Sequence, residues 1–199
     1  MQFRPQLVTA AAAPPVSVAE AKAHMRIYHE DDDTLIGALI QAAASYLDGQ
    51  GGILGRCMVS QEWRQDFARW PDNRVMRLPF PDVDPESIEI TYFDDANVEQ
   101  TVAGTSFELV EDAIGSAVVL QRGFNFPGLT DQRNAPVRVT FEAGYGDADD
   151  VPQAVRHAVL LIVADLYENR ENTVVGAVTV SQLPLGAHTL IAPFRRSGV

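Results

Sequence analysis

The sequence has only one cysteine, Cys57, among its 199 residues. A single cysteine excludes an intrachain disulfide and any zinc site built from several cysteines. It fits a reducing compartment, where thiols stay free. A nucleophilic role would need a basic partner near the sulfur, and no such partner is evident in the sequence. We therefore expect Cys57 to be a buried structural thiol.

Positive charge is scarce as well. The chain has 15 Lys and Arg residues and 27 Asp and Glu residues, so the formal net charge is −12. This balance argues against general affinity for DNA or RNA, because phosphate binding needs clustered Lys and Arg. It is compatible with a surface that DNA slides past without binding. The simpler explanation, that the acidity only keeps the protein soluble, stays open.

Long hydrophobic runs are also missing. No stretch approaches the roughly 20 apolar residues of a membrane span, and residues 1–16 are too weakly apolar for a signal peptide. We expect the protein to be made and used in a cytoplasm. Hydrophobic residues still make up 46% of the chain, which is enough for a core and argues against global disorder.

Patterns of catalytic chemistry are not found. The histidines His24, His29, His157 and His188 show no metal-binding spacing. No Gly-x-Ser-x-Gly motif occurs. The glycine-rich stretch 49–55 follows a predicted helix and lacks the Lys-Ser/Thr pair of a phosphate loop, so it predicts a helix end. We expect no catalytic residue, no metal and no cofactor.

Two acidic clusters have two possible explanations each. The first is Glu30–Asp33 and the second comprises Asp147, Asp149 and Asp150. Either could attract a divalent ion. Both also precede predicted helices, whose positive ends favour carboxylates as caps. We expect helix capping at both places, with Pro152 in the first turn of the second helix.

The remaining pattern predicts an α+β fold with a helical core, an antiparallel β-rich insert and an extended C-terminal tail. An extended arm (1–15) precedes a helix that begins with a capping box, Ser17 to Glu20. Further helices are predicted at 34–47 and 152–169 from their apolar spacing. Between them, short alternating segments separated by turns indicate an antiparallel meander or small barrel. These strands are expected at 59–67, 74–78, 87–93, 98–102, 107–110, 117–120 and 136–141.

The C-terminal tail, Asn172–Val199, contains no acidic residue. Residues 173–180 are β-prone and uncharged, and such a segment pairs with something rather than remaining an open edge. Residues 183–186 indicate a turn, and 187–192 one or two helical turns. An acidic body with an apolar, weakly basic tail is typical of a protein whose tail binds a neighbouring subunit.

Taken in order, these motifs resemble the head–tail connector (adaptor) proteins of long-tailed phages with HK97-type heads and of the related gene transfer agents. The resemblance rests on segments spread along nearly the whole chain: 16–26, 30–33, 35–47, Gln61-Glu62-Trp63, Trp70-Pro71, 78–81, Tyr92-Phe93-Asp94, 141–146, Val151-Pro152, 166–171 and Pro193-Phe194-Arg195.

The resemblance implies one connector domain over residues 1–199. It would comprise N-terminal helices (16–56), a β-rich insert (57–143), a long helix (151–171) and a docking tail (172–199). It further implies a homo-oligomeric ring of about twelve copies beneath the portal protein. The ring would extend the DNA channel and dock a tail-side neck or tail-terminator protein. The resemblance implies no enzyme activity. It places the protein in the neck of a virion or phage-like particle that is assembled in the bacterial cytoplasm.

We expect the tail to dock on the portal or on an adjacent subunit, because its low charge and terminal arginines suit such contacts. The candidate docking residues are Val175, Val178, Val180, Leu183, Leu190, Ile191, Phe194, Arg195 and Arg196. Two alternatives stay open. One is another neck component, such as a head-completion or tail-terminator protein. The other is a small metal-dependent hydrolase that uses Asp147, Asp149, Asp150 and His157.

Overall fold

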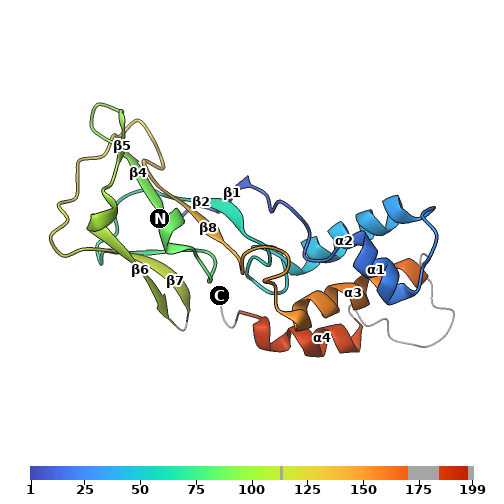
Figure 1. The fold of residues 1–199 in the computed structure, drawn as a ribbon. Coiled ribbons are helices and arrows are strands. Elements are labelled where there is room, and N and C mark those ends of the chain that lie inside the picture. Colours follow the sequence, from blue (N-terminus) through green and yellow to red (C-terminus); the bar gives the residue numbers. More distant parts are fainter. Residues whose placement is uncertain (113, 170–183, 197–199) are drawn as a thin grey trace, which may run out of the picture. The chain divides into compact units, whose positions relative to one another are not determined.

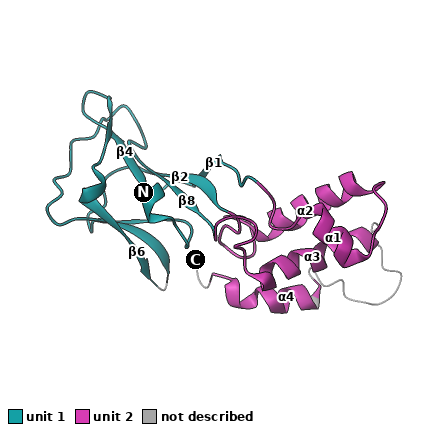
Figure 2. Cartoon of the chain, viewed as in Figure 1, with its two compact units in different colours: residues 1–12, 60–144, 197–199 teal, residues 13–59, 145–196 magenta. Residues whose placement is uncertain are grey.

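The computed structural model describes residues 1–112, 114–169 and 184–196. They fall into two compact units, which Figure 2 distinguishes by colour. The β unit contains residues 1–12 and 60–144, and the helical unit contains residues 13–59 together with the described part of 145–196. The predicted α+β class, with a β-rich segment inserted between helices, is confirmed.

The β unit holds two antiparallel sheets (Figure 1). The five-stranded sheet has the order β1 (Gln6–Thr9), β2 (Gln61–Phe67), β8 (Val137–Ala143), β4 (Glu89–Phe93) and β5 (Glu99–Thr101). The three-stranded sheet has the order β3 (Val75–Arg77), β7 (Gly115–Leu120) and β6 (Phe107–Asp112). Short 3₁₀ turns at Pro85–Ser87 and Gly104–Ser106 precede β4 and β6.

The centre of the larger sheet is the pairing of β2 with β8, in register from Gln61 opposite Ala143 to Phe67 opposite Val137. Alternate residues of β8 are buried, as expected for a strand with one face on the core. Phe80 packs against Trp63 of β2 with ring centroids 4.7 Å apart. Both aromatic side chains are buried.

The predicted strands exist, but the predicted meander or barrel is wrong. β8 lies between β2 and β4, so strands distant in sequence are neighbours in the sheet. Alternation of apolar residues determines which face of a strand is buried and does not determine its partner. The number of sheets therefore could not follow from periodicity.

The N-terminal arm is extended, as predicted, and adds the edge strand β1 to the larger sheet. The Phe3 N–H donates to the Asp66 carbonyl over 3.1 Å. In return the buried Gln65 side-chain amide donates to the Phe3 carbonyl over 2.6 Å. These bonds make the arm part of the β unit.

A long loop, residues 121–136, is fastened within the same unit. Trp70 Nε1 donates to the Pro127 carbonyl over 3.0 Å. The Arg74 guanidinium donates to the carbonyls of Gln121 and Phe124 and lies 4.8 Å from the Phe126 ring centre. These side chains thus donate hydrogen bonds to loop carbonyls that have no partner in a sheet.

The helical unit contains α1 (Val18–Met25), α2 (Asp33–Leu47), α3 (Gln153–Glu168) and α4 (Leu185–Ile191), followed by a 3₁₀ turn, Ala192–Phe194. α3 contacts each of the other three helices. Its buried aliphatic residues recur at helical spacing and include Val155, Val159 and Val163. On α2 the buried positions include Ile36, Ile40 and Leu47. Leu35 and Tyr46, which share the apolar spacing, are exposed, so the expected apolar face is confirmed only in part.

The predicted start of α1 is confirmed, because Ser17 and Glu20 form a complete capping box there. At α2 the carboxylates are placed as expected, with Asp32 at the N-cap and Asp33 as the first helical residue near the positive end of the helix. No side chain forms a capping hydrogen bond at this end, so the expected side-chain cap of α2 is wrong. The glycine-rich stretch folds back over the end of α2, where the N–H groups of residues 53 and 54 reach the carbonyls of residues 46 and 47.

Gly52 is required by this close approach. A Cβ atom there would lie 2.3 Å from backbone oxygens at the end of α2. Cys57 is fully buried beside this loop, which agrees with the predicted structural thiol. Among the residues that the structure describes, no helix is both long enough and apolar enough to span a membrane.

The smaller sheet contains the clearest ion pair of the β unit. Arg77 of β3 donates to both carboxylate oxygens of Asp112 at the end of β6, over 2.8 and 2.5 Å. Asp112 also accepts the backbone N–H groups of Ile114 and Gly115. The hydrogen bonds from Arg77, with those from the turn, lower the pKa of Asp112 from 3.8 to about 2.

We predict that Asp112→Asn lowers the melting temperature by a few degrees at pH 7. Because the folded-state pKa is depressed, this stabilisation is present above pH 3.8 and is lost as the pH falls towards 2. Thermal melts should therefore show that the difference in melting temperature between Asp112→Asn and the wild type becomes smaller as the pH is lowered from 7 to 3. Asp72→Asn, which breaks the exposed pair with Arg69, is the matched control and should have little effect. A difference that does not change with pH would contradict the assignment.

Candidate functional site

The candidate docking residues lie partly outside the described residues. This applies to Val175, Val178, Val180 and Leu183, whose role stays a prediction. The other five lie on or just after α4. Leu190, Phe194 and Arg196 are half-buried, Arg195 is exposed and Ile191 is fully buried.

The burial of Ile191 gives α4 a structural role. Together with the equally buried Ala187, it joins α4 to the core of the helical unit. Farther along, the Arg196 N–H donates to the Leu54 carbonyl over 2.9 Å. Residues 184–196 of the tail are therefore packed within the helical unit.

The turn predicted at residues 183–186 is wrong over its described part. Pro184 is the N-cap of α4, and Leu185 and Gly186 form its first turn. The φ angle that proline imposes is compatible with a turn and with the start of a helix. Pro184 therefore could not distinguish the two in the sequence. Gly186 also lies against α3, since a Cβ atom there would be 3.4 Å from Leu161.

A shallow, open and mostly apolar groove lies between α3 and α4. It is lined by His157 and Leu161 of α3 and by Gly186, Thr189 and Leu190 of α4, and its volume is about 530 Å³. The absence of a side chain at Gly186 helps to form the hollow. Such concave apolar surfaces are typical of binding sites for a side chain or ligand.

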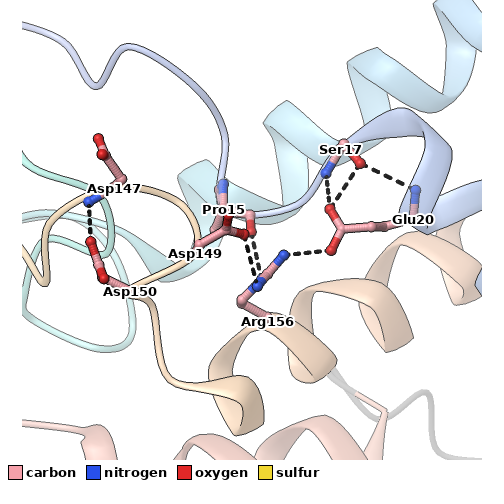
Figure 3. Close-up of polar contacts among 7 residues, drawn as sticks. All are labelled: Pro15, Ser17, Glu20, Asp147, Asp149, Asp150 and Arg156. Carbon is pink, nitrogen blue, oxygen red and sulfur yellow. Dashed lines mark hydrogen bonds and ion pairs between the residues drawn. The ribbon is translucent and has the colours of Figure 1, made fainter.

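Arg156 of α3 joins several segments of the helical unit through its guanidinium (Figure 3). Its Nε donates to the Pro15 carbonyl over 3.1 Å. One terminal nitrogen binds the Glu20 carboxylate and the other lies 3.3 Å from Asp149. The side chain is only 10% exposed. A buried guanidinium thus joins α3 to α1, to the segment before α1 and to the loop before α3.

Glu20 has two roles in this network. Its carboxylate accepts the backbone N–H of Ser17 over 2.8 Å while it binds Arg156. The pKa of Glu20 is lowered, first by the bond from the Ser17 backbone, then by the Ser17 hydroxyl and by Arg156. The capping box therefore also fixes the partner of the buried arginine.

The expected capping of α3 by aspartate is wrong. The N-cap is Pro152, and no side chain caps this helix. Asp150 instead accepts the Asp147 backbone N–H over 2.9 Å, and Asp149 pairs with Arg156. Asp150 stabilises its own loop and Asp149 binds the arginine, so neither carboxylate caps the N-terminus of α3.

The metal-site alternative is not supported by this arrangement. Within residues 1–112, 114–169 and 184–196, no three His, Cys, Asp or Glu side chains are grouped to hold a metal ion. The carboxylates of Asp149 and Asp150 have the partners given above, and Asp147 takes part through its backbone N–H (Figure 3). His157 is exposed and meets the His24 ring edge-on, with centroids 5.4 Å apart.

Sequence reasoning missed Arg156, although one signal was present. Arg156 lies between Val155 and the apolar run that follows, on the buried arc of a helix whose other residues there are aliphatic. A charged residue on such an arc is expected to have a buried partner. The partner itself could not be deduced, because Pro15 and Glu20 are far away in the sequence.

We predict that Arg156→Ala destabilises the protein by about 2 to 3 kcal/mol, because the Pro15 carbonyl loses its donor and Glu20 loses its cation. Arg156→Lys should restore only part of this, since an ammonium cannot reach three partners in a planar fork. Urea denaturation measures the effect, and Arg195→Ala, at an exposed arginine of the same unit, is the control. Equal stability of Arg156→Ala and the control would refute the role of the network.

Comparison with known proteins gives concordant results. Residues 15–68, which include α1, α2 and β2, match the family model of phage gp6-like head–tail connector proteins. No curated protein sequence matches significantly.

Solved structures match over almost the whole chain. One is described as the neck of an empty gene transfer agent particle computed with C6 symmetry. It has 25% identity and a TM-score of 0.77, and the match covers 99% of this chain and 97% of that chain. A second, the neck of a native particle computed with C12 symmetry, has 25% identity and a TM-score of 0.75 with the same coverage. A third, from the virion of a native particle, has 24% identity, a TM-score of 0.76 and again the same coverage.

The family match and the fold match agree with each other and with the resemblance that the order of motifs predicted. That resemblance to head–tail connector proteins is confirmed, and with it a structural role as a component of a particle neck.

Proposed function

We propose that this protein is a connector subunit that forms a homo-oligomeric ring on the portal protein of a phage-like particle. The ring extends the DNA channel and offers a docking surface to a tail-side neck or tail-terminator protein. It works by binding and shape, with no catalysis. Assembly takes place in the bacterial cytoplasm before the finished particle carries the ring at its neck.

The observation that carries this proposal is a single fold match over both units. Similar structures from particle necks cover 99% of this chain, so the helices and both sheets recur together. The connector family model independently matches the segment with α1 and α2. A related head-completion or tail-terminator role remains the alternative, and the connector family match favours the proposal over it.

The symmetry of the related structures supports a ring. Neck structures similar to this chain were computed with C6 and C12 symmetry, and we propose about twelve copies here. A ring of subunits that each carry a net charge of −12 presents a strongly negative surface. DNA is repelled by such a surface, so it passes through without specific binding.

The tail is the proposed contact with the portal or with a neighbouring subunit. Because α4 is packed in the helical unit, removal of all residues after 171 would also expose the core around Ile191. Substitutions between residues 173 and 180 are therefore a cleaner test than truncation.

We predict that wild-type protein forms a stacked ring on its cognate portal ring, as seen by electron microscopy. Val175→Asp with Val178→Asp should reduce portal occupancy by about tenfold or more, because buried apolar contacts at an interface reject unpaired charge. Gln41→Asp with Ala42→Asp adds the same charge at exposed positions of α2 and is the matched control. If the wild-type protein shows no ring on the portal, the proposed connector role is wrong. If the tail variant binds like the control, the tail is not the docking contact.

Divalent ions distinguish the connector from a metal-dependent hydrolase. For a connector that binds no ion tightly, we expect Mg²⁺, Mn²⁺ and Zn²⁺ at millimolar concentration to change the melting temperature by less than about 1 °C. Differential scanning fluorimetry with and without a chelator measures this. A saturable rise of several degrees that Asp149→Asn abolishes would favour the hydrolase.

A further inference from the structure

One large apolar side chain of the helical unit is almost fully exposed. Tyr28, in the connection between α1 and α2, is 91% exposed. The connection is nevertheless held at both ends. Arg26 ends α1 in a left-handed conformation with φ 59°, and the carboxylates at the start of α2 bind Lys22 and Tyr167. Tyr28 is thus presented on an anchored loop.

With 91% of its surface exposed, Tyr28 buries very little area within its own chain. Tyrosine is enriched at the centres of protein interfaces, because it covers a large area and loses little conformational entropy. Its exposure on a fixed loop therefore suggests a partner surface that is hollow and mostly apolar.

The same unit carries such a hollow. The groove between α3 and α4, lined by Leu161 and Leu190 among others, has a volume of about 530 Å³ and a mostly apolar lining. The ring nitrogens of His157, an exposed residue of its lining, can meet a phenol.

The charges next to these two features are of opposite sign. Tyr28 is followed by Glu30 and Asp31, which are both exposed. By contrast, residues 184–196, which include α4, contain no acidic side chain and carry the exposed Arg195 next to their last residue. An acidic loop and a cationic segment of this kind orient two surfaces during encounter.

We propose that the Tyr28 loop of one subunit binds the α3–α4 groove of the next copy, with Glu30 and Asp31 facing Arg195. The contact joins two different faces of one protein, so it repeats from copy to copy and can close into a ring. The proposal rests on the connector function and specifies the surfaces through which its ring would form.

Disulfide cross-linking tests the contact. The variant Tyr28→Cys with Leu190→Cys is assembled on the portal ring, oxidised mildly and run on a non-reducing gel. We expect a ladder of covalent oligomers that each single variant fails to give. Cys57 can stay, because it is fully buried. Tyr28→Cys with Val98→Cys, an exposed residue of the β unit, is the matched control and should give no ladder.

Charge reversal gives a second readout that does not disturb the groove. Asp31→Lys should raise the protein concentration needed for half-maximal ring formation by about three- to tenfold, as expected for a charge at an interface rim. Arg195→Glu should do the same, and the two changes together should restore assembly towards wild type. Rescue distinguishes this contact from a separate effect of Arg195 on the portal.

The outcomes separate the two proposals. Rings on the portal without a cross-linked ladder and without rescue would overturn the Tyr28 contact and leave the connector function standing. Failure of the wild-type protein to form any ring on the portal would overturn the connector function, and the proposed contact with it.

Discussion

The helical unit depends on the buried guanidinium of Arg156. It satisfies the Pro15 carbonyl, the Glu20 carboxylate and Asp149, and these lie on three different segments of the chain. A charge in the interior is tolerated only when its partners are fixed. The capping box at Ser17 fixes Glu20, so a local sequence rule at the start of α1 determines how α1 is held on α3. The segment that enters α1 and the loop that enters α3 are placed by the same side chain.

The two units suit a protein that acts by contact. The helical unit offers an anchored, exposed Tyr28, a mostly apolar groove and a C-terminal segment free of acidic side chains. The β unit has its loops tied down by side chains such as Trp70 and Arg74. Rigid surfaces of this kind lower the entropic cost of assembly. The aspartates that suggested chemistry serve instead to fix a loop and an arginine.

Features that depend on neighbours in sequence could be predicted. The capping box, part of the face of α2, the glycine-rich end of α2 and the extent of α3 follow from local hydrogen bonding and helical spacing. Features that depend on distant partners could not. The position of β8 between β2 and β4, the three partners of Arg156 and the start of α4 are set by tertiary contacts. The docking role of residues such as Val175 remains a prediction from sequence.

The most direct test of the connector role removes the protein from the particle. The coding sequence is deleted in the cell that makes the particles, and the products are examined by electron microscopy. The structural account predicts heads that contain a portal and no attached tail, with free tails beside them, and recovery of tailed particles when the gene is supplied again. Tailed particles with an intact neck in the deletion strain would contradict it.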